Sequence, residues 1–121
     1  MAQPQTLYFM KSSVLQRADT LLAMIRQEAS NLEDENARIW VDVFRTENVS
    51  GYQLRNEALD RVCCITGNRK GDGYRVIFGS AEHFAFESGA PLDTAGFAIY
   101  RYDDVYRAAV FVLNYLTGKV S

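Results

Sequence analysis

The side chains best suited to covalent chemistry in this chain are two adjacent cysteines, Cys63 and Cys64, and its one histidine, His83. A thiol activated by an imidazole is the nucleophile of one class of enzyme, and such partners can be distant in sequence. A zinc site requires three or four ligands, and adjacent cysteines lack the spacing of a zinc knuckle. Buried cysteine is also common as a small apolar residue. We therefore predict no catalytic residue, no metal site and no cofactor.

A second stretch that could do chemistry is RVCCITGNRKGDGYRVIFG, residues 61–79, in which a glycine-rich loop separates two apolar runs. A P-loop carries Lys followed by Ser or Thr after its second glycine, and a dinucleotide-binding loop leads into a helix. Neither feature is present, since a strand pattern follows. We expect a hairpin turn with positive φ angles at Gly67, Gly71 and Gly73. The alternative is an anion contact made by the basic residues Arg69, Lys70 and Arg75.

Asp42 is a carboxylate within the otherwise apolar run ARIWVDVFR, residues 37–45. Both faces of this run are largely apolar, which favours a central strand. A carboxylate there needs a partner, and we expect one of three arginines to supply it: Arg38, Arg45 or Arg101. Asp42 and Arg101 therefore complete the residues that we predict for a ligand contact.

Two amphipathic helices are predicted at opposite ends of the chain. Ser13 and Gln16 form a capping box, after which apolar residues recur at helical spacing: Leu15, Ala18, Leu21, Leu22, Ile25, Ala29 and Leu32. A second helix is predicted from a cap at Asp103 or Asp104 to about Thr117, with Gly118 as the stop signal. Its core stripe is Val105, Ala108, Ala109, Val112, Leu113 and Leu116.

The predicted C-terminal helix is apolar almost all round, because Tyr106, Val110, Phe111 and Tyr115 leave it little polar surface. A helix of this kind is buried on more than one side. We predict a subunit or partner contact through these four residues. The alternative is that the helix lies between the sheet and the N-terminal helix.

Strands are predicted where β-branched and aromatic residues cluster or alternate with polar ones: residues 6–11, 37–45, 61–66, 73–79, 83–87 and 97–102. Residues 47–60 fit either a short helix capped by Ser50 or an edge strand. The short connections favour an α+β fold, with a mostly antiparallel sheet of five to six strands and both helices on one face.

Size and composition indicate one domain, residues 1–121, with residues 1–5 flexible. Apolar residues make up 48% of the chain and the net charge is −2, which is typical of a globular protein and does not favour nucleic acid or anionic membranes. No signal-peptide pattern or membrane span is present, so we expect a small, acidic, soluble cytoplasmic protein.

These features predict a small non-enzymatic interaction or accessory protein that binds another macromolecule, for example an inhibitor or immunity protein, and that forms a homodimer. The absence of an assembled catalytic motif, the apolar C-terminal helix and the seven tyrosines favour this function. The alternative is a small-ligand-binding domain with a pocket between sheet and helices. We expect its lining to include Trp40, Tyr100, Tyr102 and Arg101.

Overall fold

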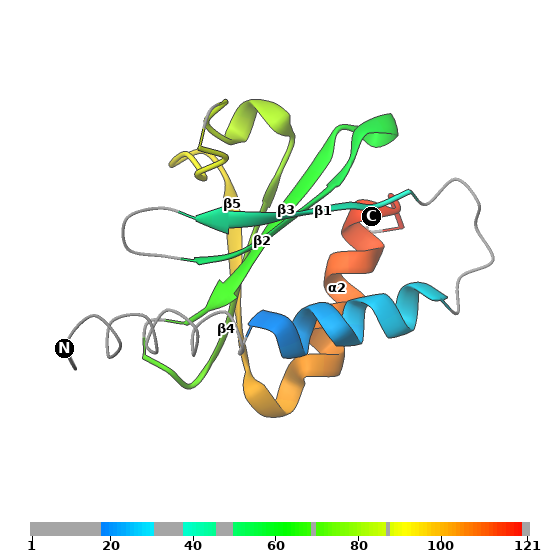
Figure 1. Ribbon diagram of the computed structural model, residues 1–121, viewed down its shortest axis with the longest axis vertical. Coiled ribbons are helices and arrows are strands. Elements are labelled where there is room, and N and C mark those ends of the chain that lie inside the picture. The colour runs from blue at the N-terminus through cyan, green and yellow to red at the C-terminus, as the bar shows by residue number, and fades with distance from the viewer. Residues whose placement is uncertain (1–17, 31–37, 46–49, 69, 87, 120–121) are drawn as a thin grey trace, which may run out of the picture.

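Five antiparallel strands form one sheet in which each strand lies beside its neighbour in sequence (Figure 1). The computed structural model describes residues 18–30, 38–45, 50–68, 70–86 and 88–119. The strands are β1 (Trp40–Arg45), β2 (Ser50–Asn56), β3 (Arg61–Gly67), β4 (Gly73–Gly79) and β5 (Gly96–Arg101). Because β1 and β5 are the outer strands, β3 is central, and five consecutive residues of it are buried.

Two helices cover one face of this sheet, which confirms the predicted α+β fold (Figure 1). Residues 18–30 are helical, and α2 spans Val105–Leu116. Leu21, Leu22 and Ile25 from the first helix and the α2 stripe pack with Leu54, Cys63, Ile65, Tyr74 and Val76 of the sheet. The helical spacing thus identified the buried residues of both helices within the described residues.

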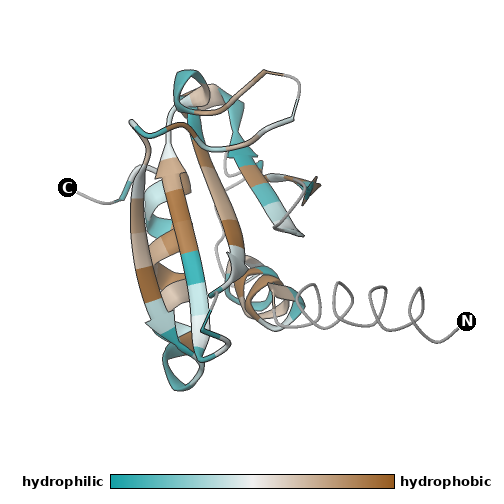
Figure 2. Ribbon diagram, turned by 90° about the vertical axis from the view of Figure 1, so that its left-hand side faces the viewer, coloured by the Kyte–Doolittle hydropathy of each residue, from teal (hydrophilic) through white to brown (hydrophobic). Residues whose placement is uncertain are grey.

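The opposite face of the sheet, which we call the helix-free face, has a smaller core. Figure 2 shows hydrophobic residues along the strands as well as along the helices. Phe44, Val62, Cys64 and Ile77 point to this face and pack with Phe84 from the segment that joins β4 to β5. A residue and its successor on a strand point to opposite faces, so Cys63 and Cys64 belong to different cores.

The glycine-rich stretch of the sequence is a hairpin turn, as predicted. The Asn68 N–H donates to the Gly73 carbonyl at 2.8 Å, and the Gly71 N–H donates to the Asn68 carbonyl at 2.9 Å. Gly71 has a φ of 73°, whereas Gly67 and Gly73 lie in strands and do not have the positive φ expected of them. Gly73 is required for another reason, because a Cβ there would lie 2.0 Å from the Tyr100 carbonyl oxygen.

The structure corrects three predictions about strands. β1 is an edge strand and not a central one, because among the described residues only β2 pairs with it. The described part of the predicted strand 83–87, residues 83–86, does not form a strand: Phe84 makes one isolated bridge to Pro91, and residues 81–83 form a 3₁₀ turn. The ambiguous stretch 47–60 contains β2, which is an internal strand. The predicted strand 6–11 and the capping box lie outside the described residues.

The helices of the described ranges are short and amphipathic. None of them has the length and apolarity that a membrane-spanning helix requires.

Candidate binding site

The two cysteines and the histidine lie in different environments. Both cysteine side chains are completely buried, and both are free thiols. Cys64 Sγ lies 3.9 Å from Gln53 Nε2 and 3.9 Å from the Gly89 carbonyl oxygen. His83 lies in the 3₁₀ turn after β4, where its Nδ1 accepts a hydrogen bond from the Ser80 N–H at 2.9 Å.

Burial also keeps both thiols protonated. It raises the pKa of the Cys64 thiol to about 12, against a smaller opposing effect of the hydrogen bond from Gln53. Burial raises the pKa of Cys63 as well, and the adjacent Cys64 acts in the same direction. A nucleophilic cysteine requires the opposite shift, toward the thiolate.

Two of the predicted basic residues lie together on the helix-free face. Arg75 on β4 pairs with Ile99, and Arg101 on β5 pairs with Gly73, so the two arginines are diagonal neighbours. The Arg75 guanidinium carbon lies 5.0 Å from the centre of the Phe97 ring. Lys70 is exposed in the turn that leads into β4, and Arg69 lies outside the described residues.

Asp42 lies at the other edge of the sheet, far from Arg75 and Arg101 in strand order. Its Oδ2 accepts a hydrogen bond from Arg55 Nη2 at 2.9 Å, and its side chain is 60% exposed. The predicted partner was therefore wrong, because Arg55 on the neighbouring strand β2 pairs with it instead. An exposed ion pair of this kind contributes little to stability, at most about 1 kcal/mol.

The four residues predicted for a partner contact on α2 divide into two pairs. Phe111 and Tyr115 contact Phe78 of β4, with ring centres 5.2 Å apart in each case. Tyr106 is 55% exposed, and Val110 is partly buried. The inner pair thus belongs to the packing of α2 on the sheet, and the outer pair faces away from the core.

A hollow of about 550 Å³ lies on the helix-free face beside the segment that joins β4 to β5. It is lined by Gln53, Arg55, Val62, Ala81, Glu82, Phe84, Ala85, Phe86 and Gly89. Phe86 is fully exposed, although its neighbour Phe84 is buried. Trp40, which is 56% exposed, is the direct partner of Arg55 across the β1–β2 pair. We call this region, with Trp40 at its side, the aromatic hollow.

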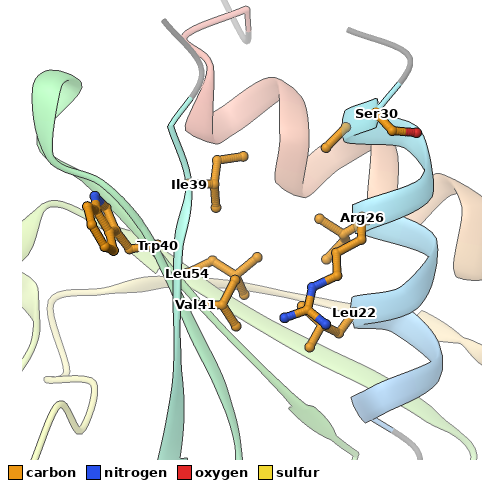
Figure 3. Close-up of a pocket in the computed structure, with 9 residues that line it drawn as sticks. Leu22, Arg26, Ser30, Ile39, Trp40, Val41 and Leu54 are labelled. Atoms are coloured by element: carbon orange, nitrogen blue, oxygen red, sulfur yellow. The ribbon is translucent and has the colours of Figure 1, made fainter. Parts of the chain in front are cut away.

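A second cavity, of about 580 Å³, lies between the first helix and β1 (Figure 3). Its walls are mostly aliphatic: Leu22, Ile25, Ala29, Ile39, Val41 and Leu54. Arg26 reaches into the space between the helix and β1, and Ser30 lies at one end of the cavity (Figure 3). We call it the helix-side pocket.

The helix-side pocket lies between sheet and helices, where we expected a ligand site, but most of its lining residues are not the predicted ones. Trp40 is the one predicted lining residue that it includes. Tyr100 and Arg101 are on β5, at the opposite edge of the sheet, and Tyr102 follows β5 directly. Sequence reasoning missed Arg26, because on a helical stripe it falls among the solvent-facing polar residues.

The described residues contain no group of three or more His, Cys, Asp and Glu side chains that could hold a metal ion. Comparison of the chain with protein-family models, with curated proteins and with solved structures gives no significant match in any of the three.

Proposed function

We propose that this protein is a non-enzymatic interaction protein that binds another macromolecule at the aromatic hollow. The observation that carries this proposal is the exposure of two large aromatic side chains, Trp40 at 56% and Phe86 at 101%, beside the Arg55–Asp42 ion pair. Aromatic residues and arginine are the residue types that contribute most to protein–protein binding.

The shape of the aromatic hollow favours a protein partner. The concave surface offers an apolar wall at Val62 and Phe84 and a polar rim at Gln53 and Glu82. An apolar core within a polar rim is the usual arrangement of a protein interface. We infer that one apolar side chain of the partner enters the hollow between Trp40 and Phe86, as an inhibitor or accessory protein would bind its target.

The proposal is tested by comparing two variants of the full chain. A Trp40→Ala, Phe86→Ala chain and a Val43→Ala chain are each expressed with a tag in the native cell, and co-purified proteins are quantified by mass spectrometry. Val43 is a matched control, because it is 58% exposed on the same strand as Trp40 but points to the other face. We expect a partner that binds the wild type and the control and is reduced tenfold or more with the double variant, since tenfold equals about 1.4 kcal/mol.

We further propose that the protein is a homodimer and that α2 contributes to the contact. Tyr106 and Val110 lie one turn apart on the outer side of α2, and Tyr106 is 55% exposed. A light-scattering mass of two chains at micromolar concentration is the expected result. A mass of one chain would contradict this part of the proposal and would leave the aromatic hollow unaffected.

A second candidate function is supported by the helix-side pocket, whose size is typical of a small-ligand site. Its aliphatic walls and the Arg26 guanidinium favour a molecule with an apolar body and an anionic group.

Decanoate should raise the melting temperature of the protein more than decanol does, and Arg26→Gln should remove this difference. A ligand at 100 times its Kd stabilises the folded protein by about 2.7 kcal/mol. Arg107→Gln, on exposed α2 surface, is the control. Equal shifts for both compounds would contradict this function.

A further inference from the structure

The outer edge of β5 carries unpaired backbone groups. β5 (Gly96–Arg101) pairs with β4 along its whole length and without a bulge, and no strand among the described residues pairs with its other side. It contains neither proline nor lysine. Natural proteins usually protect an exposed edge with such residues, with bulges or with a covering segment, because an open edge attracts another strand. The backbone N–H and C=O groups of this edge therefore favour pairing with another extended strand.

The side chains of β5 are unusually apolar for an exposed edge. Phe97 is 59% exposed and Ile99 is 56% exposed, and both point to the helix-free face. Ala98 and Tyr100 point to the helix side. Arg101 is the charged residue of the strand, and it stands at one end.

We propose that β5 pairs antiparallel with β5 of a second copy of this chain, centred on Ala98, so that two sheets join into one of ten strands. In this register Phe97 of each copy lies directly opposite Ile99 of the other. Aromatic and β-branched residues are favourable neighbours across antiparallel strands. The four side chains form one apolar cluster across the junction, and the strand is thus complementary to itself.

The arginines select this register over the next one. A pairing centred on Ile99 would place Arg101 of one copy opposite Phe97 of the other, and that ring already lies 5.0 Å from the Arg75 guanidinium carbon. Two cations would then meet at one ring, and their mutual repulsion disfavours this register. Centring on Ala98 leaves Arg101 outside the apolar cluster.

The pairing also brings the two α2 helices together. The two-fold axis of an antiparallel strand pair is perpendicular to the sheet, so both copies keep their helices on the same side. α2 packs over the β5 side of the sheet, where Phe111 lies 6.1 Å from Tyr100 between ring centres. The inference rests on the homodimer proposed above and supplies its geometry.

Cysteine cross-linking of the full chain tests the register. Residues directly opposite in an antiparallel pair have Cβ atoms about 4.5–5.5 Å apart, and a disulfide can bridge that distance with little movement. Cys63 and Cys64 are completely buried, so they do not react. We expect Ala98→Cys to form a covalent dimer under mild oxidation, and Val43→Cys, on the exposed edge strand β1, to stay uncross-linked. Equal cross-linking of the two variants would indicate random collision and would overturn the inference.

A charge at the junction provides a second test that does not depend on the cysteine. Ile99→Lys places two ammonium groups within the apolar cluster, and we expect the mass by light scattering to fall from two chains to one. Val43→Lys should remain a dimer, and circular dichroism should show both variants folded. A wild-type dimer that Ile99→Lys leaves intact and Ala98→Cys does not cross-link would overturn the β5 pairing while the homodimer stands. A monomeric wild type would overturn both.

Discussion

At the scale of single residues, Asn56 has a structural role that no pattern in the sequence indicated. It lies at the end of β2 and is 3% exposed. Its Nδ2 donates to the Leu116 carbonyl at 2.7 Å, and its Oδ1 accepts from the Ala58 N–H at 3.1 Å. Arg61 Nη1 donates to the Tyr115 carbonyl at 3.1 Å. Asn56 thus satisfies a carbonyl group that the last turn of a helix leaves unpaired, and Arg61 adds a second donor to the Tyr115 carbonyl, which also accepts from the Gly118 N–H at 3.3 Å.

Replacing Asn56 with alanine should therefore destabilise the protein. The Leu116 carbonyl would lose its partner in a buried position, which typically costs about 1–3 kcal/mol, and the more exposed Ala58 N–H would lose its partner as well. Urea denaturation followed by circular dichroism measures this loss. Asn114→Ala is the control, because Asn114 is partly exposed on α2 and its side chain makes no hydrogen bond to the described residues. An Asn56→Ala chain as stable as the control would contradict the role of Asn56.

At the scale of elements, several predictions that rested on local pattern agree with the structure. The helical stripes of residues 18–30 and α2, the hairpin after β3 and the alternation of β5 all depend on neighbours in sequence. The errors depend on tertiary position. Whether β1 lies at the edge of the sheet is decided by which strands pair, and a pattern within β1 does not contain that information.

The segment around Phe84 and Phe86 shows the same limit. The alternation of the two phenylalanines predicted a strand with both rings on one side, but Phe84 is buried and Phe86 is fully exposed. The chain turns between them, with the Gly89 N–H donating to the Ala85 carbonyl at 2.8 Å. The aromatic hollow arises from this turn, so no local pattern of residues indicated it. The helix-side pocket was expected in its general place but not in its residues.

Gly73 provides a prediction at this scale, because it sets how closely β4 and β5 approach. In Gly73→Ala the new Cβ would lie 2.0 Å from the Tyr100 carbonyl oxygen, so the backbone must shift. Overpacking of this kind costs about 1–3 kcal/mol. Thermal unfolding measures the loss, with Lys70→Ala in the same turn as an exposed control. A melting temperature equal to that of the control would show that β4 and β5 can move apart without loss of stability.

At the scale of the whole molecule, β3 joins two cores that lie on opposite faces of one sheet. Cys63 is completely buried in the helix-side core, and Cys64 is completely buried in the core of the helix-free face. Burial keeps each thiol neutral, so both cores contribute to the pH dependence of the free energy of unfolding.

Stability should fall as the pH rises above 9, the ordinary pKa of a thiol. Because the folded pKa of both thiols is raised, the unfolded chain loses these protons while the folded chain keeps them. Stability is therefore complete below pH 9 and declines above it, by at most about 1.4 kcal/mol per pH unit for each thiol. Urea denaturation between pH 8 and 10 measures the slope, and Cys64→Ala should lower it by the contribution of one thiol. Burial also raises the pKa values of Tyr74, Tyr100 and Tyr115 above 10, so these tyrosines add the same amount to the slope of both proteins toward pH 10. An unchanged slope in the variant would contradict this account.

Because the two sulfurs lie on opposite faces of β3, the reactivity of each thiol would also show when its face of the sheet becomes exposed. Detachment of the helices would uncover Cys63, whereas release of the segment that carries Phe84 would uncover Cys64. A brief pulse of alkylating reagent, followed by fragment-ion mass spectrometry of the peptide that contains both residues, would assign each event to one side of the sheet. The order in which the two layers come apart can thus be measured without introducing a label.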